Sequence, residues 1–282
     1  MRGNIFKIEG SPMVSIVMPA HNVCAFLAES IRSILAQTYP FWELLIIDDA
    51  SGDNTFEVAQ TFQKKDPRIK PVRLPTNQGA GFARNVGIKA SEGEYIAFLD
   101  ADDIWLPFKL ERQLEFMQKH DLKVSYASYE LIDEQSESLN LVVKALKELS
   151  PQKILKANYV GNLTGMYHAH SLGKIYCPPI RKRQDWALWI HAIRKAGGAR
   201  GIEEVLAQYR VRKHSLSGNK WEMLRYNYTV YRNVLGYSGL RSRLLFLQFL
   251  FEQFFVKSRQ TEVAPARPDS AEEGLLPHDG KE

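Results

Sequence analysis

The chain has 282 residues, of which 45% are hydrophobic and 24% charged, as expected for a globular protein with one α/β domain and an appendage or two small domains. Its net charge of +5 favours anionic partners such as nucleotides or lipid headgroups, and the absence of any nucleic-acid-binding motif argues against nucleic acid. Two distant cysteines exclude a disulfide framework, and no apolar stretch predicts a secretory signal or the roughly 20-residue span of a membrane helix.

The first hundred residues predict strands that alternate with helices. Short apolar runs predict buried strands at 14–18, 43–47, 69–74 and 95–99. Apolar residues three and four positions apart predict helices at 25–36, 51–62 and 79–90. This alternation predicts a mostly parallel sheet with right-handed crossovers and helices on its faces.

The pattern is looser after residue 103. We expect helices at 107–119 and 185–196, strands at 124–129 and 205–211, and a polar loop or helix pair at 133–150. The resulting domain prediction is a catalytic domain over 12–218, with a nucleotide-binding half (12–103) and an acceptor half (104–218). A helical extension (219–261) and a disordered tail (262–282) follow it.

Polar clusters follow the predicted strands, where parallel sheets bind their ligands. Asp100, Asp102 and Asp103 come directly after the fourth strand. Three neighbouring carboxylates repel one another unless a cation neutralises them, and oxygen ligands suit Mg²⁺ or Mn²⁺. A solvated acidic turn, or Asp103 as the cap of the next helix, is the alternative interpretation.

The second strand ends in Asp48 and Asp49, which can bind a nucleobase or ribose hydroxyl or can cap a helix. Arg84 lies in a glycine-bearing segment, 77–85, that opens a helix. That segment lacks the third glycine of a dinucleotide fingerprint and does not follow the first strand. Arg84 is therefore a candidate for contacting a phosphate or base, or is a surface arginine.

Two further candidates lie late in the chain. Asp185 precedes a helix with Trp186 and is a possible general base beside an aromatic sugar site, or a helix cap beside core tryptophans. Arg212 and His214 can close over a diphosphate, and His214 can also complete a metal site. A basic surface loop explains the same two residues.

Together these motifs resemble the family 2 glycosyltransferases of the GT-A fold, especially bacterial enzymes that build surface polysaccharides. The resemblance covers 14–217 and begins with the strand and turn that end in Pro19, Ala20, His21 and Asn22. It continues through Asp48-Asp49-Ala50-Ser51, Ala83-Arg84-Asn85, Asp100-Ala101-Asp102-Asp103 and Gln184-Asp185.

The resemblance implies an inverting transfer from a nucleotide-diphosphate sugar, expected to be a UDP-sugar, to an acceptor hydroxyl in lipopolysaccharide, capsule or exopolysaccharide synthesis. The donor-binding residues it implies are Pro19, Ala20, Asn22, Asp49, Arg84, Asp100, Ala101 and Asp102. Mn²⁺ or Mg²⁺ would be held by Asp102, Asp100 and His214, with Asp185 as the base. The diphosphate and acceptor candidates are Arg212, His214, Trp186 and Asp103. Because Gln184 stands where many members have an acid, the assignment of the base depends on Asp185 alone.

The most apolar segment is 241–259, with cations at both ends. It predicts either a helix in the membrane interface, with contact through 240–259, or a helix docked on the protein or a dimer partner. A membrane location fits a cytoplasmic enzyme on the inner face of the plasma membrane. It also fits a polyprenyl-diphosphate-linked or lipid A-linked acceptor.

Two other classes of function stay open. A nucleotidyltransferase or sugar-phosphate kinase would need a phosphate-binding glycine loop after the first strand, which 19–22 does not supply. A degenerate transferase that only binds nucleotide sugar or scaffolds a membrane assembly has the same motifs. Donor hydrolysis in the presence of Mn²⁺ distinguishes this module from an enzyme.

Overall fold

The computed structural model describes residues 12–212 and 220–264. The first half contains β1 (Val14–Ala20), α1 (Cys24–Leu35), β2 (Trp42–Asp48), α2 (Thr55–Gln63), β3 (Ile69–Arg73), α3 (Ala80–Ala90) and β4 (Tyr95–Phe98). The middle contains β5 (Ile104–Trp105), α4 (Lys109–Lys119), β6 (Val124–Ile132), β7 (Ser138–Val143), β8 (Glu148–Leu149), η1 (Asn162–Thr164), β9 (Met166–His168) and α5 (Ala169–Leu172). The remainder contains α6 (Gln184–Ala196), β10 (Ala199–Arg210), α7 (Lys220–Thr229), η2 (Val230–Val234), α8 (Gly239–Phe251), η3 (Glu252–Val256), η4 (Lys257–Gln260) and β11 (Thr261–Val263).

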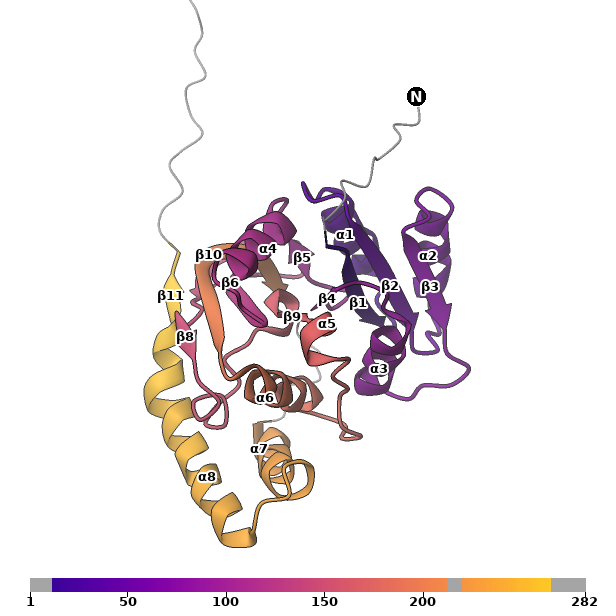
Figure 1. The fold of residues 1–282 in the computed structure, drawn as a ribbon. Helices are drawn as coiled ribbons and strands as arrows, with labels where there is room; N and C mark the ends of the chain where they lie inside the picture. Colours follow the sequence, from indigo (N-terminus) through magenta and orange to yellow (C-terminus); the bar gives the residue numbers. More distant parts are fainter. Residues whose placement is uncertain (1–11, 213–219, 265–282) are drawn as a thin grey trace, which may run out of the picture.

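One mixed sheet runs through the molecule in the order β11-β7-β6-β9-β4-β1-β2-β3 (Figure 1). In its first half, β1 pairs in parallel with both β2 and β4, and β2 pairs in parallel with β3. Every residue of β1 and β2 is buried, as expected for strands that helices cover on both faces. The predicted parallel sheet of the first hundred residues is therefore confirmed.

The second half of the sheet mixes strand directions. Strand β9 is antiparallel to β4 and β6, whereas β10 is parallel to β6. The prediction of a loop or helix pair at 133–150 is wrong, because β7 pairs with β6 and β8 pairs with β10 in this segment. The sequence pattern of this polar segment does not indicate strands. It forms them because it pairs with the long strands β6 and β10.

Alternate side chains of the strands enter two cores on opposite faces of the sheet. Val17 and Ile47 pack with α3 and α6 on one face, whereas Ile16 and Ile46 pack with α1, α2 and α4 on the other. On the α6 face, a Cβ on Gly165 would lie 2.1 Å from the ring of Trp189, so only glycine fits beside that ring. The predicted helices at 79–90, 107–119 and 185–196 correspond to α3, α4 and α6 within two residues.

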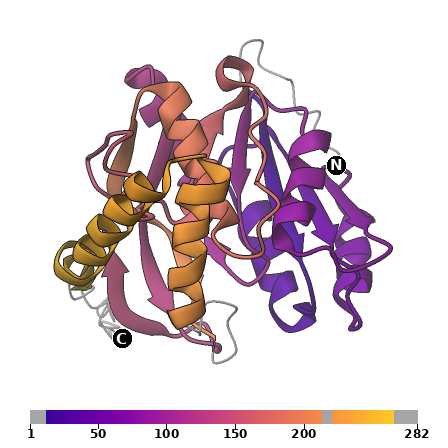
Figure 2. The same ribbon diagram turned by 90° about the horizontal axis from the view of Figure 1, so that it is seen from below.

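The C-terminal extension packs against the second half of the chain. Figures 1 and 2 show α8 on the outer flank, on the side opposite the strands and helices of the first half. Val230, Tyr231 and Phe249 are buried in the same core as α6, so the extension is joined by packing to the preceding part of the chain. Strand β11 reaches Val263, one residue past the expected start of the tail at 262, and pairs with β7.

Candidate active site

The carboxyl ends of β1 and β2 lie side by side and hold the first group of predicted residues. Pro19 is opposite Ile47 in the β1–β2 register, and the Asp49 N–H donates to the Ala20 carbonyl at 2.8 Å. Asn22 has φ 50°, a conformation that asparagine tolerates, and its Oδ1 accepts the Gly52 N–H at 2.9 Å. The structure therefore brings Pro19, Ala20, Asn22 and Asp49 together.

The Asp49 carboxylate holds the loop that enters α3. It accepts the N–H groups of Gln78 and Gly79, each at 2.7 Å, and the residue is only 2% exposed. It therefore caps the approach to α3 rather than the helix that directly follows it in the sequence. A carboxylate offers about four acceptor positions, so these two bonds leave others for a donor group of a base or ribose.

Arg84 orients the first aspartate of the acidic turn. Its Nη2 donates to Asp100 Oδ1 at 2.6 Å, and the arginine is 7% exposed. Burial alone would lower the pKa of Arg84, but the neighbouring Asp100 carboxylate outweighs it and the pKa is raised. Arg84 Nε is buried and has no hydrogen-bond partner among the described residues.

The other two acids of this turn differ in their surroundings. Asp102 pairs with Arg212, whose Nη1 lies 2.9 Å from Asp102 Oδ2. Burial raises the pKa of Asp102, the bond from Arg212 opposes this rise, and the charge on Asp100 adds to it. Asp103 is 1% exposed and accepts the Arg210 N–H at 2.9 Å, and burial together with the two neighbouring carboxylates raises its pKa strongly.

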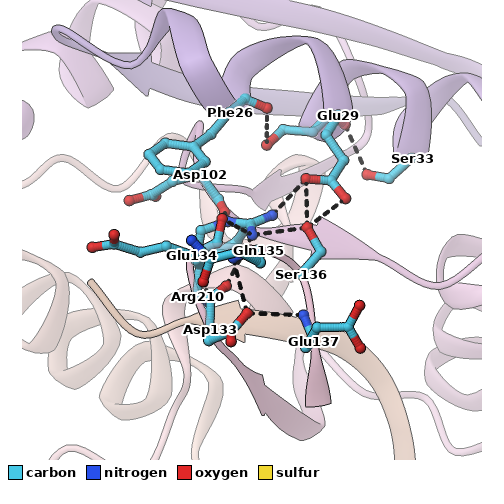
Figure 3. Close-up of polar contacts among 12 residues, drawn as sticks. Phe26, Glu29, Ser33, Asp102, Asp133, Glu134, Gln135, Ser136, Glu137 and Arg210 are labelled. Carbon is cyan, nitrogen blue, oxygen red and sulfur yellow. Dashed lines mark hydrogen bonds and ion pairs between the residues drawn. The ribbon is translucent and has the colours of Figure 1, made fainter. Parts of the chain in front are cut away.

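Arg210 is a central residue of this region that the sequence interpretation missed. Its side chain is fully buried and donates to the Asp102 carbonyl at 2.8 Å and to Glu29 of α1 at 2.6 Å. It also donates to the carbonyl of Asp133 and to Ser136 Oγ, so it links the acidic turn to α1 and to the β6–β7 loop (Figure 3). Its position between apolar residues at the end of a predicted strand was the available signal.

Asp185 faces the same cavity as Asp100. This cavity has a volume of about 290 Å³. Its polar lining residues are Asp100, Asp103, Asn158, Asn162, Arg183, Asp185, Tyr209, Lys257 and Gln260. Asn158 Nδ2 donates to Asp185 Oδ2 at 3.0 Å, which fixes one oxygen of the carboxylate and leaves the other available. Asp100 and Asp103 of the acidic turn thus share one cavity with the predicted base.

The expectation that Trp186 borders a sugar is wrong. Its ring is fully buried, its Nε1 donates to the Ile154 carbonyl at 2.8 Å, and it packs against Tyr231 and Phe249. The periodicity of the helix explains this difference. Neighbouring residues of α6 point in different directions, so that Trp186 faces the core while Asp185 faces the cavity. The aromatic residues that do line the cavity, Tyr129, Tyr159 and Tyr209, come from other elements.

The donor set fits a divalent cation that takes part of its coordination from a phosphate. Asp100 and Asp102 each have one oxygen bonded to an arginine, and their side chains remain 32% and 24% exposed. No group of three or more His, Cys, Asp or Glu side chains suited to a metal exists among the described residues. Mg²⁺ and similar ions commonly bind through one or two carboxylates and substrate phosphates. His214, the third predicted ligand, lies outside the described residues.

Comparison with solved structures identifies the fold. The chain superposes on TarS of S. aureus in complex with UDP-GlcNAc with a TM-score of 0.67 at 21% identity, covering 86% of this chain and 73% of TarS. A mannosyltransferase from Pyrobaculum calidifontis, solved with GDP-Man and Mn²⁺, gives a TM-score of 0.62 at 15% identity, over 88% and 72% of the two chains. The expected GT-A fold is thereby confirmed.

Comparison of sequences identifies the family. TuaG of Bacillus subtilis (strain 168), assigned to teichuronic acid biosynthesis, is 37% identical over 84% of this chain and 94% of TuaG. WfgD of Escherichia coli, named as a UDP-Glc:alpha-D-GlcNAc-diphosphoundecaprenol beta-1,3-glucosyltransferase, is 36% identical over 77% of this chain and 85% of WfgD. The family model "Glycosyl transferase family 2" matches residues 15–174, and the chain belongs to this family of glycosyltransferases.

Proposed function

We propose that this protein transfers a sugar, with inversion, from a UDP-sugar to a hydroxyl of a polyprenyl-diphosphate-linked saccharide during the synthesis of a surface polysaccharide. The transferred sugar is a hexose or an N-acetylhexosamine. The observation that carries the proposal is that Asp100, at the end of β4, and Asp185, at the start of α6, line one cavity. WfgD, which by its name acts on a diphosphoundecaprenol acceptor, supports the choice of acceptor.

In this mechanism, Asp185 takes the proton from the acceptor hydroxyl while Asn158 keeps the carboxylate in place. Asp102 and Asp100 would hold a divalent cation, Mn²⁺ or Mg²⁺, which would supply positive charge to stabilise the leaving diphosphate. Arg84 fixes Asp100, and Arg212 is placed beside Asp102 to contact the same diphosphate. Attack from the Asp185 side opposite the leaving group inverts the anomeric centre, and alignment of the two substrates lowers the barrier further.

The test is Asp185→Asn, which keeps an acceptor oxygen for Asn158 but removes the base. We expect unchanged UDP affinity and a loss of transfer of at least about 100-fold, the usual contribution of a general base. Asp121→Asn is the matched control, since Asp121 pairs with Lys123 in a loop away from the cavity. Normal turnover in Asp185→Asn would contradict the assignment of the base. Absence of both transfer and donor hydrolysis in the unchanged protein, with every UDP-sugar tried, would contradict the function.

We further propose that the enzyme works at the inner face of the plasma membrane, bound through 240–259. No described helix is long and apolar enough to cross a bilayer. One face of α8 and η3 nevertheless exposes large apolar side chains, which we call the apolar stripe: Leu240, Leu244, Leu247, Phe251, Phe254 and Phe255. Each is at least 53% exposed, while Phe249 on the other face is buried in the core. An apolar surface of this kind suits the interface of a bilayer.

Replacing Leu247, Phe251 and Phe254 together with glutamine tests this contact without disturbing Phe249. We expect the variant to lose most of its co-sedimentation with anionic liposomes. Exposed Phe82 lies on α3 in the first half of the chain, so Phe82→Gln is the control. Equal partitioning of the triple variant and the unchanged protein would exclude the apolar stripe as the membrane contact.

A further inference from the structure

We propose that Lys257 and Arg183 form a binding subsite for the diphosphate of the lipid-linked acceptor, so that the C-terminal extension supplies part of the active site. This inference rests on the proposed function. Both residues line the cavity that contains Asp100 and Asp185. The family model ends at residue 174 and includes neither of them.

Lys257 is the first residue of η4 and lines the cavity. Its Nζ donates to the carbonyl of Asn158, the residue whose side chain binds Asp185. Burial, with a contribution from the charge of Arg183, lowers the pKa of Lys257 to about 8. The lysine therefore stays largely protonated at neutral pH and retains hydrogen-bonding protons for a ligand.

Arg183 approaches the same region from the start of α6. Its φ of 65° is left-handed, a conformation unusual for arginine, and it sets the side chain against the rings of Trp186 and Phe249 at 5.9 and 6.0 Å. Its Nε is buried without a hydrogen-bond partner among the described residues. Burial lowers the pKa of Arg183 and the Asp185 charge opposes this, but a guanidinium remains charged.

The charges on this wall do not balance. On this wall the cations Lys257 and Arg183 lie near one carboxylate, Asp185, because Asp100 pairs with Arg84 and Asp103 accepts the Arg210 N–H. Mutual repulsion of two half-buried cations is relieved when an anion binds between them. A diphosphate, with oxygens that accept bonds from guanidinium and ammonium groups, suits this arrangement.

The diphosphate bound here would belong to the acceptor rather than the donor. The donor diphosphate is assigned to the acidic turn, where Arg212 pairs with Asp102, whereas Lys257 and Arg183 lie on the side of the proposed base. Moreover, Lys257 follows Phe254 and Phe255 of the apolar stripe, which are 67% and 62% exposed. One short segment therefore presents apolar rings to a lipid phase and a cation to the cavity.

Lys257→Met and Arg183→Met, each made in the full chain, test the subsite with an alkyl diphosphate that carries no sugar. Undecyl diphosphate is titrated into protein saturated with UDP and Mg²⁺, so that the donor site is already filled. We expect its affinity to fall roughly tenfold to a hundredfold in each variant, as for loss of a charge-assisted hydrogen bond. UDP affinity should not change, and Lys257→Arg should restore most of the binding.

Lys147→Met is the matched control, since this lysine is an exposed residue paired with Glu203. Undecyl glucoside, which has the alkyl chain and no charge, should bind all variants equally. Unchanged diphosphate affinity in both variants, or an equal loss for the glucoside, would overturn the subsite. Donor hydrolysis by the unchanged protein is measured in parallel, so that failure of the subsite is distinguished from failure of the proposed function. Thermal unfolding shows whether each variant is folded.

Discussion

The two halves of the active site are built in different ways. On the proposed nucleotide side, two acidic residues are held by groups close to them in the sequence: Asp49 by the N–H groups 29 and 30 residues later, and Asp100 by Arg84, 16 residues earlier. On the acceptor side, Lys257 reaches Asn158 across 99 residues, and Glu252 reaches Lys153 across the same separation. Asp49 and Asp100 are thus held by partners within the first hundred residues, whereas Lys257 reaches the cavity only because the C-terminal extension returns to it.

Arg210 binds Asp102 across 108 residues and Glu29 across 181 residues, and it also binds Asp133 and Ser136 in the β6–β7 loop. If these bonds hold the acidic turn in place, removing them should impair both transfer and stability. We expect Arg210→Met to lower transfer about a hundredfold or more, since small displacements of reacting groups have effects of that size. It should also lower the free energy of unfolding by on the order of 3 kcal/mol, because buried carbonyl groups and Glu29 lose their partner. Turnover assays and urea unfolding measure the two effects.

Arg68→Met provides the control for that substitution. Arg68 also binds a carboxylate, that of Asp66, and a carbonyl, that of Pro40, and it lies 3.7 Å from the ring of Trp42. It precedes β3, at the end of the sheet opposite the active site. We expect a moderate loss of stability and near-normal transfer. An equal loss of transfer in both variants would mean that Arg210 contributes only to stability.

The same difference explains what could be predicted from the sequence. The strand ends, the acidic turns and Arg84 follow from local apolar patterns and from motifs with short spacings, and the structure brings them together. Strands β7 and β8 could not be predicted, because their pairing with β6 and β10 is a tertiary effect on a polar segment. Arg183 and Lys257 carry no motif; Arg183 lies at the start of α6, and only the packing of the extension places Lys257 in the cavity.

On the nucleotide side, a local change should have a local effect. Asp49→Asn puts an amide where a carboxylate accepts two N–H groups, so an NH₂ group faces a donor and the loop entering α3 must move. We expect UDP affinity to fall about tenfold, the equivalent of one charge-assisted hydrogen bond, with little change in alkyl diphosphate binding. Titration calorimetry with both ligands measures this. Asp66→Asn is the control, because Asp66 likewise accepts a backbone N–H, that of Arg68.

The smallest effect should come from loosening the extension at Glu252. This buried carboxylate accepts bonds from Lys153 and from the Tyr159 hydroxyl. Glu252→Gln keeps the shape but removes the charge, so we expect unfolding to become easier by about 1 to 2 kcal/mol. UDP affinity should stay the same and alkyl diphosphate affinity should fall a few-fold, which is the pattern expected if the extension serves only the acceptor side.

The acid dependence of that stability difference identifies its cause. Burial raises the pKa of Glu252, but the bonds from Lys153 and Tyr159 outweigh burial and leave the pKa below its ordinary value of 4.5. A carboxyl whose pKa is lowered by folding stabilises the native state fully above its unfolded pKa and loses that contribution as the pH falls through its folded pKa. The difference in unfolding free energy between the unchanged protein and Glu252→Gln should therefore be constant at neutral pH and shrink below 4.5. A difference that stays constant in acid would assign the effect to packing, and the extension would then be held by its apolar core, through Phe249 and Tyr231, rather than by this ion pair.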